Sequence, residues 1–252
     1  MANTEDVPLG ISYFITIIIN SVACPFTVLL NVLVIKVVMT RPRLRTNSNI
    51  LLACLAVTDV LTGLFGQPSH VLWRIFLISG LSTSEKVEDF HFNVMFILAT
   101  ALCLHLILVS FERLVAIKFT MQYPNVITDS NLKIAVSAIW IIAFMCGTFR
   151  VLKMYLVINS MASLITISCI VFVVSAQVIL FRETRRHQRK IKARQLPQDE
   201  VERFTREYKA LKTTVFVIGA IIVCLLPACF CSTLSATGLY DICPINDSLW
   251  QT

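Results

Sequence analysis

One stretch of this sequence limits what the chain can fold into more than any other, because residues 90–118 are apolar almost throughout. His105 is the only ionisable side chain in the apolar middle of this stretch, which closes on the adjacent pair Glu112 and Arg113. About 20 apolar residues suffice to cross the hydrocarbon core of a bilayer as an α-helix. We therefore predict a transmembrane helix whose last turns carry an acid beside a base.

The composition of the 252-residue chain agrees with a membrane protein. Its residues are 56% hydrophobic and 15% charged, and its mean hydropathy is +0.77, whereas soluble domains carry about 25% charged residues. The net charge of +7 does not indicate a nucleic-acid partner, because the basic residues lie in loops between apolar runs, where they act as topology signals. Most of the nine cysteines lie inside apolar runs, and no spacing resembles a metal site.

Six apolar runs predict an all-α transmembrane helical bundle in one domain, residues 1–252. The expected helices cover residues 11–39, 49–73, 90–118, 132–149, 156–181 and 209–234. Gly66, Gln67 and Pro68 are expected to bend the far end of the second helix. Because only a few residues separate the fourth run from the fifth, these two helices should be antiparallel neighbours.

The basic residues set the expected topology of the bundle. They gather in the first, third and fifth loops, at Arg41, Arg43, Arg45, Lys118 and in the cluster after residue 181. Cytoplasmic loops of membrane proteins carry an excess of Lys and Arg, so we expect a multi-pass protein of the plasma membrane with its amino terminus outside. Six crossings also place the carboxyl end outside, where Asn246 begins a glycosylation sequon.

The pair Glu112 and Arg113 has two interpretations. Both side chains can simply extend to the headgroup region, as long charged side chains do near helix ends. Alternatively, the pair is functional, because charges so close to hydrocarbon are costly and usually mark a working site.

The residues from Ser110 to Ile117 resemble the end of the third helix in rhodopsin-like (class A) G-protein-coupled receptors. Those receptors carry Asp or Glu, then Arg, then usually Tyr at this point, and here Leu114 stands in place of the Tyr. Further markers of the family stand on four other expected helices, at Asn31, Asp59, Trp140 and Pro227. The resemblance covers about residues 11–234 and implies six of the seven helices of such a receptor.

The resemblance implies a coupling role for Asp59, a buried acid that must be neutral or paired. In such receptors this position binds sodium, although the hydroxyl that they often carry on the third helix falls here at Leu102. The alternative is a structural one, in which a protonated Asp59 hydrogen-bonds to Asn31. No other cofactor is expected.

The resemblance also implies a switch around Arg113. Aligning the chain on Pro227 places Glu207 at the cytoplasmic start of the sixth helix, where the family can have a second acid facing this arginine. In the inactive state Arg113 is then held between Glu112 and Glu207. In the active state the sixth helix swings outward about Pro227 and frees Arg113 to meet a heterotrimeric G protein. Alternatively, Glu207 is one of many exposed loop charges.

Several departures from the family bear on the ligand. The cysteine that usually tops the third helix falls at Glu88, the usual tryptophan of the sixth helix is Leu225, and the acid that anchors amines falls at Met95. Met95 therefore argues against a biogenic amine as the extracellular ligand. The missing disulfide and the short second outer loop look most like the melanocortin, lysolipid and cannabinoid group. In that case Glu88 and Asp89 could face a basic group on a peptide, and otherwise they are solvated loop acids.

The chain shows no seventh apolar run, so we expect either a fragment or a truncated gene product. It has no nucleophile–base pair, metal cluster or phosphate loop, and we expect a receptor rather than an enzyme. Two alternatives stay open at this point. One is a six-helix transporter or channel subunit, which would need charged residues along a path through several helices. The other is a non-signalling truncated receptor.

Overall fold

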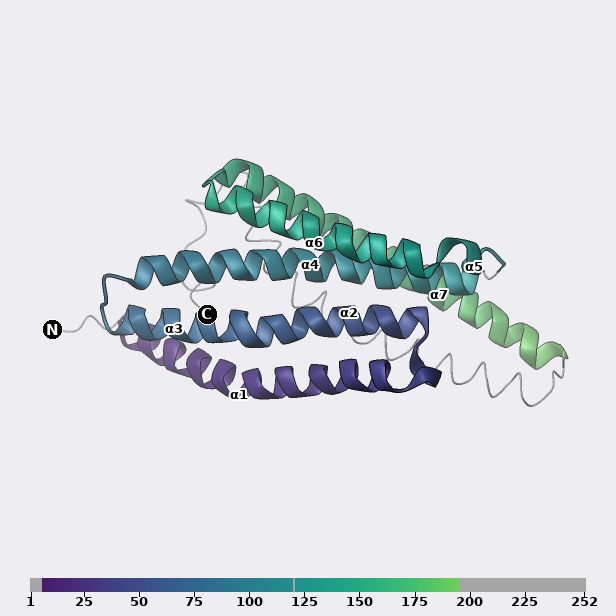
Figure 1. The fold of residues 1–252 in the computed structure, drawn as a ribbon, viewed down its shortest axis with the longest axis horizontal. Helices are drawn as coiled ribbons and strands as arrows, with labels where there is room; N and C mark the ends of the chain where they lie inside the picture. The colour runs from purple at the N-terminus through teal and green to yellow at the C-terminus, as the bar shows by residue number, and fades with distance from the viewer. Residues whose placement is uncertain (1–5, 120, 195–252) are drawn as a thin grey trace.

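The computed structural model describes residues 6–119 and 121–194 of the protein, which form a bundle of long helices joined by short turns (Figure 1). Its elements in chain order are α1 (Asp6–Thr40), η1 (Pro42–Leu44), α2 (Asn47–Leu61), η2 (Thr62–Gly66), α3 (Gln67–Ile78), α4 (Ser84–Lys118), α5 (Tyr123–Val126), α6 (Asp129–Val151) and α7 (Tyr155–Arg194). The sixth expected helix, residues 209–234, lies outside the described residues.

Local sequence signals explain several of these boundaries. Thr46 caps α2, because its side chain accepts a hydrogen bond from the Asn49 backbone amide at 3.4 Å, and Thr128 caps α6 in the same way through Asn131 at 3.2 Å. A π-helical turn, η2, interrupts the second expected helix just before Pro68, where the sequence predicted a bend. A proline removes a backbone donor and clashes with the preceding turn of an α-helix, and a wider turn relieves that clash.

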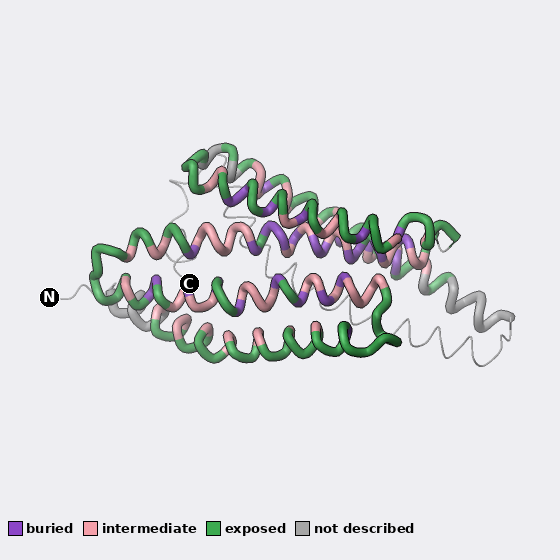
Figure 2. The backbone as a smooth tube through the Cα atoms, viewed as in Figure 1, coloured by how far each residue is buried: buried purple, intermediate pink, exposed green. Residues whose placement is uncertain are grey.

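The helix α4 is the centre of the bundle and packs against α2, α3, α6 and α7. Apart from His91, its buried residues lie between Leu98 and Val115, in the part of the helix nearer α5 (Figure 2). The approach of α6 is close because Gly147 has no side chain, and a Cβ atom there would lie 2.5 Å from Cγ1 of Ile97 on α4. The core therefore sits along α4 rather than at the middle of a symmetric ring.

The outward faces of the helices are apolar. Large hydrophobic side chains such as Ile18, Phe26, Ile134 and Leu164 are more than half exposed. Among the described residues, five helical segments are long and apolar enough to cross a membrane. An exposed apolar surface of this extent is expected where lipid tails rather than water surround the protein, so the chain is a multi-pass membrane protein.

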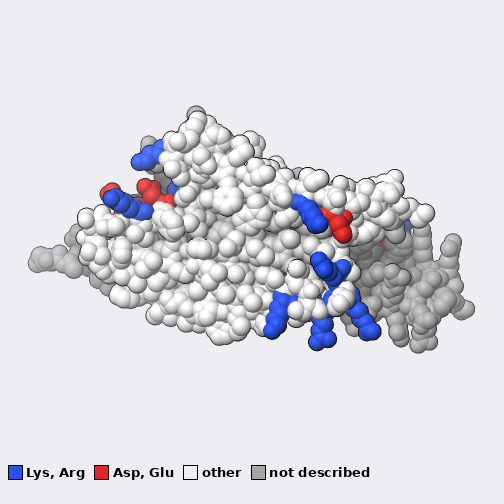
Figure 3. Space-filling view, viewed as in Figure 1, with Lys and Arg blue, Asp and Glu red and all other residues white. Residues whose placement is uncertain are grey.

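Charged side chains gather toward the two ends of the bundle and leave the surface between them uncharged on the face shown in Figure 3. We call the end with η1 and α5 the basic end; its bases include Arg41, Arg43, Arg45 and Lys118. The opposite end holds the turn between α3 and α4 and the turn between α6 and α7. Its charged residues include Glu85, Lys86, Glu88, Asp89, Arg150 and Lys153.

One difference from the sequence prediction concerns Arg74, which directly follows the second expected helix, residues 49–73. The helix continues to Ile78, and the Arg74 side chain is fully buried. Its guanidinium carbon lies 4.5 Å from the ring centre of Tyr13 and 4.2 Å from that of Trp73. Aromatic faces attract cations and are strong partners when water is excluded, which explains how a base so far along the helix can be buried.

Candidate functional site

The clearest polar site of the described structure surrounds Glu112 at the basic end. The carboxylate is completely buried, and its Oε1 atom accepts hydrogen bonds from the Ser48 hydroxyl and, at 2.9 Å, from the Tyr123 hydroxyl. Its Oε2 atom lies 3.6 Å from Nε of Arg113, within the range of an ion pair but too far for a hydrogen bond. Glu112 is thus held firmly through one oxygen and loosely through the other.

Three separate elements bring these groups together. Ser48 lies in the first turn of α2, Glu112 in the last turns of α4, and Tyr123 begins α5. A further bond, from the Asn47 side-chain amide to the Ile127 carbonyl at 2.9 Å, ties the start of α2 to the segment after α5. The site therefore connects two loops of the basic end to the central helix.

The electrostatic setting of Tyr123 follows from this geometry. Burial, and the negative charge of the neighbouring Glu112, raise the pKa of the Tyr123 phenol above its usual value of 10.0. The phenol consequently stays protonated at neutral pH and acts as a hydrogen-bond donor.

The Arg113 side chain is held less firmly than Glu112. It is 26% exposed, compared with 1% for its partner, and its Nε atom has no hydrogen-bond partner among the described residues. The sequence predicted the pairing of Arg113 with Glu112, and the structure places the two side chains together. Ser48 and Tyr123 were not predicted, and no local sequence signal marks them as donors to this acid.

The deeper polar residues Asn31 and Asp59 lie on α1 and α2. The Asn31 amide donates to the Thr27 carbonyl of its own helix at 2.9 Å. Asp59 is half-buried, and within the described part of the chain its carboxylate forms no hydrogen bond or ion pair, including none with Asn31. A sodium ion at Asp59 stays a prediction.

The residues predicted to face a ligand lie in different settings at the opposite end. Glu88 is half-buried and Asp89 exposed in the first turns of α4. Met95 is half-buried and packs its sulfur against Gly66, where an added Cβ would lie 2.8 Å from Sδ. The remaining predicted residues, Glu207, Leu225, Pro227 and Asn246, lie outside the described residues.

A buried cluster near the opposite end went unnoticed in the sequence. His91 is stacked on Trp73 with ring centres 5.6 Å apart, and its Nδ1 atom lies 2.9 Å from the Ser69 hydroxyl. Together with the buried Arg74, this cluster adds buried polar groups to the α3 and α4 side of the bundle. The helical spacing along α3 places Ser69, His70 and Trp73 near one face. This spacing alone does not reveal the cluster, because His91 comes from α4.

Comparison with known protein families places the chain. The profile described as "7 transmembrane receptor (rhodopsin family)" matches residues 30–249, which is most of the sequence. Together with the helical bundle and the pairing of the buried Glu112 with Arg113, this match shows that the chain belongs to the rhodopsin family of seven-transmembrane receptors, whose members are receptors and not enzymes.

Individual relatives within that family differ in their ligands. The histamine H2 receptor of Cavia porcellus is 32% identical over 134 residues, which cover 53% of this chain and 36% of that receptor. Melanocortin receptor 5 of Sus scrofa is 25% identical over 233 residues, which cover 88% of this chain and 75% of that receptor. The adenosine receptor A2b of Bos taurus is 29% identical over 117 residues, 46% of this chain and 34% of that receptor. The chain thus spans less than half the length of the histamine relative.

Proposed function

We propose that the protein is a plasma-membrane receptor that passes an extracellular signal to a heterotrimeric G protein through Arg113. The observation that carries this proposal is the geometry around Glu112. A carboxylate with two hydroxyl donors on one oxygen stays in place, whereas Nε of the arginine beside it has no hydrogen-bond partner among the described residues and a quarter of the arginine side chain is exposed. The Arg113 side chain can therefore move away from Glu112 while the hydrogen bonds to Glu112 stay in place.

The proposed orientation follows from charge. The basic end, which carries η1 and the Glu112 site, faces the cytoplasm, because cytoplasmic loops are enriched in Lys and Arg. The amino terminus and the turns between α3 and α4 and between α6 and α7 then lie outside. In the active state, the sixth helix moves outward about Pro227 and releases Arg113 from Glu112 and from Glu207.

The ligand is proposed not to be a simple biogenic amine, because Met95 stands where amine receptors carry an acid. The sulfur of Met95 packs against Gly66, so this position contributes apolar surface. Family membership favours a receptor over a six-helix transporter or channel. The experiment must therefore distinguish a signalling receptor from one that does not signal.

The experiment compares G-protein activation in cells that express the 252-residue chain and two variants. Glu112→Gln removes the charge that holds Arg113 and is expected to raise basal activation, whereas Arg113→Ala is expected to abolish it. Arg43→Ala, an exposed base on η1, serves as the control for loss of positive charge. Equal signals from all four proteins at equal surface expression would contradict the proposal and favour the non-signalling alternative.

A further inference from the structure

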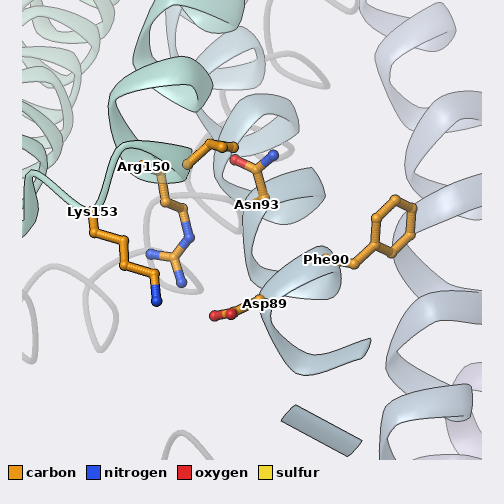
Figure 4. A pocket seen from close by; sticks show the side chains of 6 residues that line it. Asp89, Phe90, Asn93, Arg150 and Lys153 are labelled. Carbon is orange, nitrogen blue, oxygen red and sulfur yellow. The ribbon is translucent and has the colours of Figure 1, made fainter. Parts of the chain in front are cut away.

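A cavity of about 280 Å³ opens at the opposite end, far from the Glu112 site. It lies between the first turns of α4 and the end of α6 with the turn that follows it. Its lining consists of Asp89, Phe90, Asn93, Arg150, Val151 and Lys153. In Figure 4 the side chains of Arg150 and Lys153 extend from the end of α6 toward the side of the cavity where Asp89 lies. The cavity is therefore lined by opposite charges from two helices.

These charges face the cavity without neutralising one another. Among the described residues, neither Arg150 nor Lys153 lies within 4.0 Å of the Asp89 carboxylate, so no ion pair closes the space between them. Arg150 is half-buried, and its guanidinium carbon lies 5.5 Å from the ring centre of Phe92. That cation–π contact fixes the direction of the arginine and leaves its N–H donors for another group.

The α4 side of the cavity also carries an unused acceptor. The Oδ1 atom of Asn93 is buried and has no hydrogen-bond partner among the described residues. A buried carbonyl oxygen without a donor is costly. This oxygen is packed toward α6, 3.6 Å from where a Cβ on Gly147 would lie. Asn93 therefore forms part of the cavity wall, and Asp89 is the acid that α4 presents to a ligand.

The backbone at Lys153 indicates that its side chain has a role. Lys153 has φ +55° and occupies the position after the end of α6 that glycine usually takes. The Lys153 amide donates to the Arg150 carbonyl at 2.9 Å, and the Met154 amide donates to the Phe149 carbonyl at 3.3 Å, the two bonds of a Schellman cap.

The same cap at the end of α3 provides an internal comparison. There Gly80, with φ +63°, donates to the Leu77 carbonyl at 3.2 Å, and Leu81 donates to the Phe76 carbonyl at 3.2 Å. The chain thus uses glycine for this conformation at one helix end and a strained lysine at the other. Strained residues of this kind gather at functional sites.

We propose that this cavity binds a small zwitterionic molecule of the amino-acid type. The ligand's carboxylate would pair with Arg150 and Lys153, and its ammonium group with Asp89. A simple anion would meet the charge of Asp89, and a simple cation would meet two bases, so a ligand with both charges fits best. The cavity lies near the lower end of the usual range of about 300–1,000 Å³ for ligand pockets, which favours a small ligand. This inference rests on the proposed receptor function, for which it names a ligand class.

The test measures ligand-induced thermal stabilisation of the purified 252-residue chain in nanodiscs of phosphatidylcholine. The probes are β-alanine, γ-aminobutyrate and longer ω-amino acids, each compared with the amine and the carboxylate of the same chain length. We expect at least one amino acid to raise the Tm while its matched amine and carboxylate do not. Equal shifts from a matched amine or carboxylate, or no shift from any amino acid, would overturn the proposal.

Lys153→Gly is the decisive variant, because it removes the charge and relieves the backbone strain together. Without ligand, the Lys153→Gly variant should melt at a higher temperature than the natural chain. Its affinity for the amino acid should nevertheless fall at least about tenfold, as expected for the loss of one charged contact. Lys153→Arg keeps the charge and should retain binding. Unchanged affinity in Lys153→Gly would contradict the assignment.

This experiment is separable from the test of the proposed function. Binding is measured without a G protein, so a chain that binds the amino acid but never activates a G protein would refute the receptor mechanism and leave the cavity assignment standing. A chain that activates a G protein through Arg113 but binds none of the probes would refute the cavity assignment only.

Discussion

Glu112 draws its contacts from three separate parts of the chain. Its hydroxyl donors lie 64 residues before it, at Ser48, and 11 residues after it, at Tyr123. A buried carboxylate that loses its donors keeps the cost of desolvation without compensation. The two hydroxyls are therefore expected to stabilise this site more than the 3.6 Å ion pair between Glu112 and Arg113 does.

Removing the two donors should destabilise the chain in a cooperative way. Ser48→Ala and Tyr123→Phe should each lower the free energy of unfolding by about 1–3 kcal/mol. Because both hydroxyls bond to the same oxygen, the double variant should deviate from additivity by at least about 0.5 kcal/mol. Denaturant unfolding in micelles measures these values, with the exposed Ser137→Ala as the control. Additive losses would show that the two donors act independently.

The same geometry predicts a pH dependence. Tyr123 must be protonated to donate to Glu112, and its pKa is raised by burial and by the Glu112 carboxylate. Because the pKa is higher in the folded than in the unfolded chain, the stabilisation is complete below the usual value of 10.0 and is lost as the pH rises through the raised pKa.

An ultraviolet absorbance titration of the natural chain minus that of Tyr123→Phe isolates this phenol. The difference curve should have its midpoint above the usual tyrosine value. A midpoint at or below that value would argue that the phenol is solvated rather than bonded to Glu112.

At the scale of the helices, the two Schellman caps show how one backbone motif can serve two purposes. The cap at Gly80 ends α3 with the residue that suits a positive φ, and nothing lies within 4 Å of where a Cβ would be. The cap at Lys153 ends α6 with a residue that does not suit it. The residue at the Gly80 cap therefore suits the backbone conformation, whereas the residue at the Lys153 cap supplies a charged side chain.

Substitutions at these two positions should change stability in opposite directions. Gly80→Ala should destabilise the chain by about 1 kcal/mol, because an L-residue is forced into the left-handed region without a compensating contact. Lys153→Gly should stabilise it by a similar amount for the converse reason. Thermal unfolding of the two variants beside the natural chain measures both signs. Destabilisation by Lys153→Gly would indicate that the lysine side chain supports the fold itself.

At the scale of the whole molecule, the apolar runs predicted the helical bundle, and the markers led by Glu112 and Arg113 predicted the family. Both predictions are confirmed. Hydropathy identifies membrane helices well because every backbone polar group in lipid must be satisfied within a helix. The pairing of Glu112 with Arg113 was also predictable, since the two are adjacent in sequence. The donors Ser48 and Tyr123 were not, because they reach Glu112 only after separate elements have packed together.

Arg74 shows a second limit of the sequence. A charge after an apolar run normally marks the start of a loop, yet Tyr13 and Trp73 provide aromatic faces that allow this one to be buried. The cavity at Asp89 and Arg150 also depends on packing between elements that are separate in sequence, because its two sides come from α4 and α6.

The orientation of the bundle gives a prediction at this scale. With the basic end in the cytoplasm, Arg43→Cys should be protected in intact cells from a membrane-impermeant maleimide, and Ser82→Cys, in the turn between α3 and α4, should be labelled. Permeabilised cells should label both, and the natural chain gives the background from its own cysteines. The reverse pattern in intact cells would contradict the proposed topology.

One measurement tests most directly whether this chain acts on a G protein through Arg113. The 252-residue chain and its Arg113→Ala variant, each purified in nanodiscs, are mixed with purified heterotrimeric G proteins, and the rate of guanine-nucleotide exchange is followed. We predict that the natural chain accelerates exchange above the rate with empty nanodiscs and that Arg113→Ala does not. Equal acceleration by both chains, or none by the natural chain with any G protein, would contradict the account.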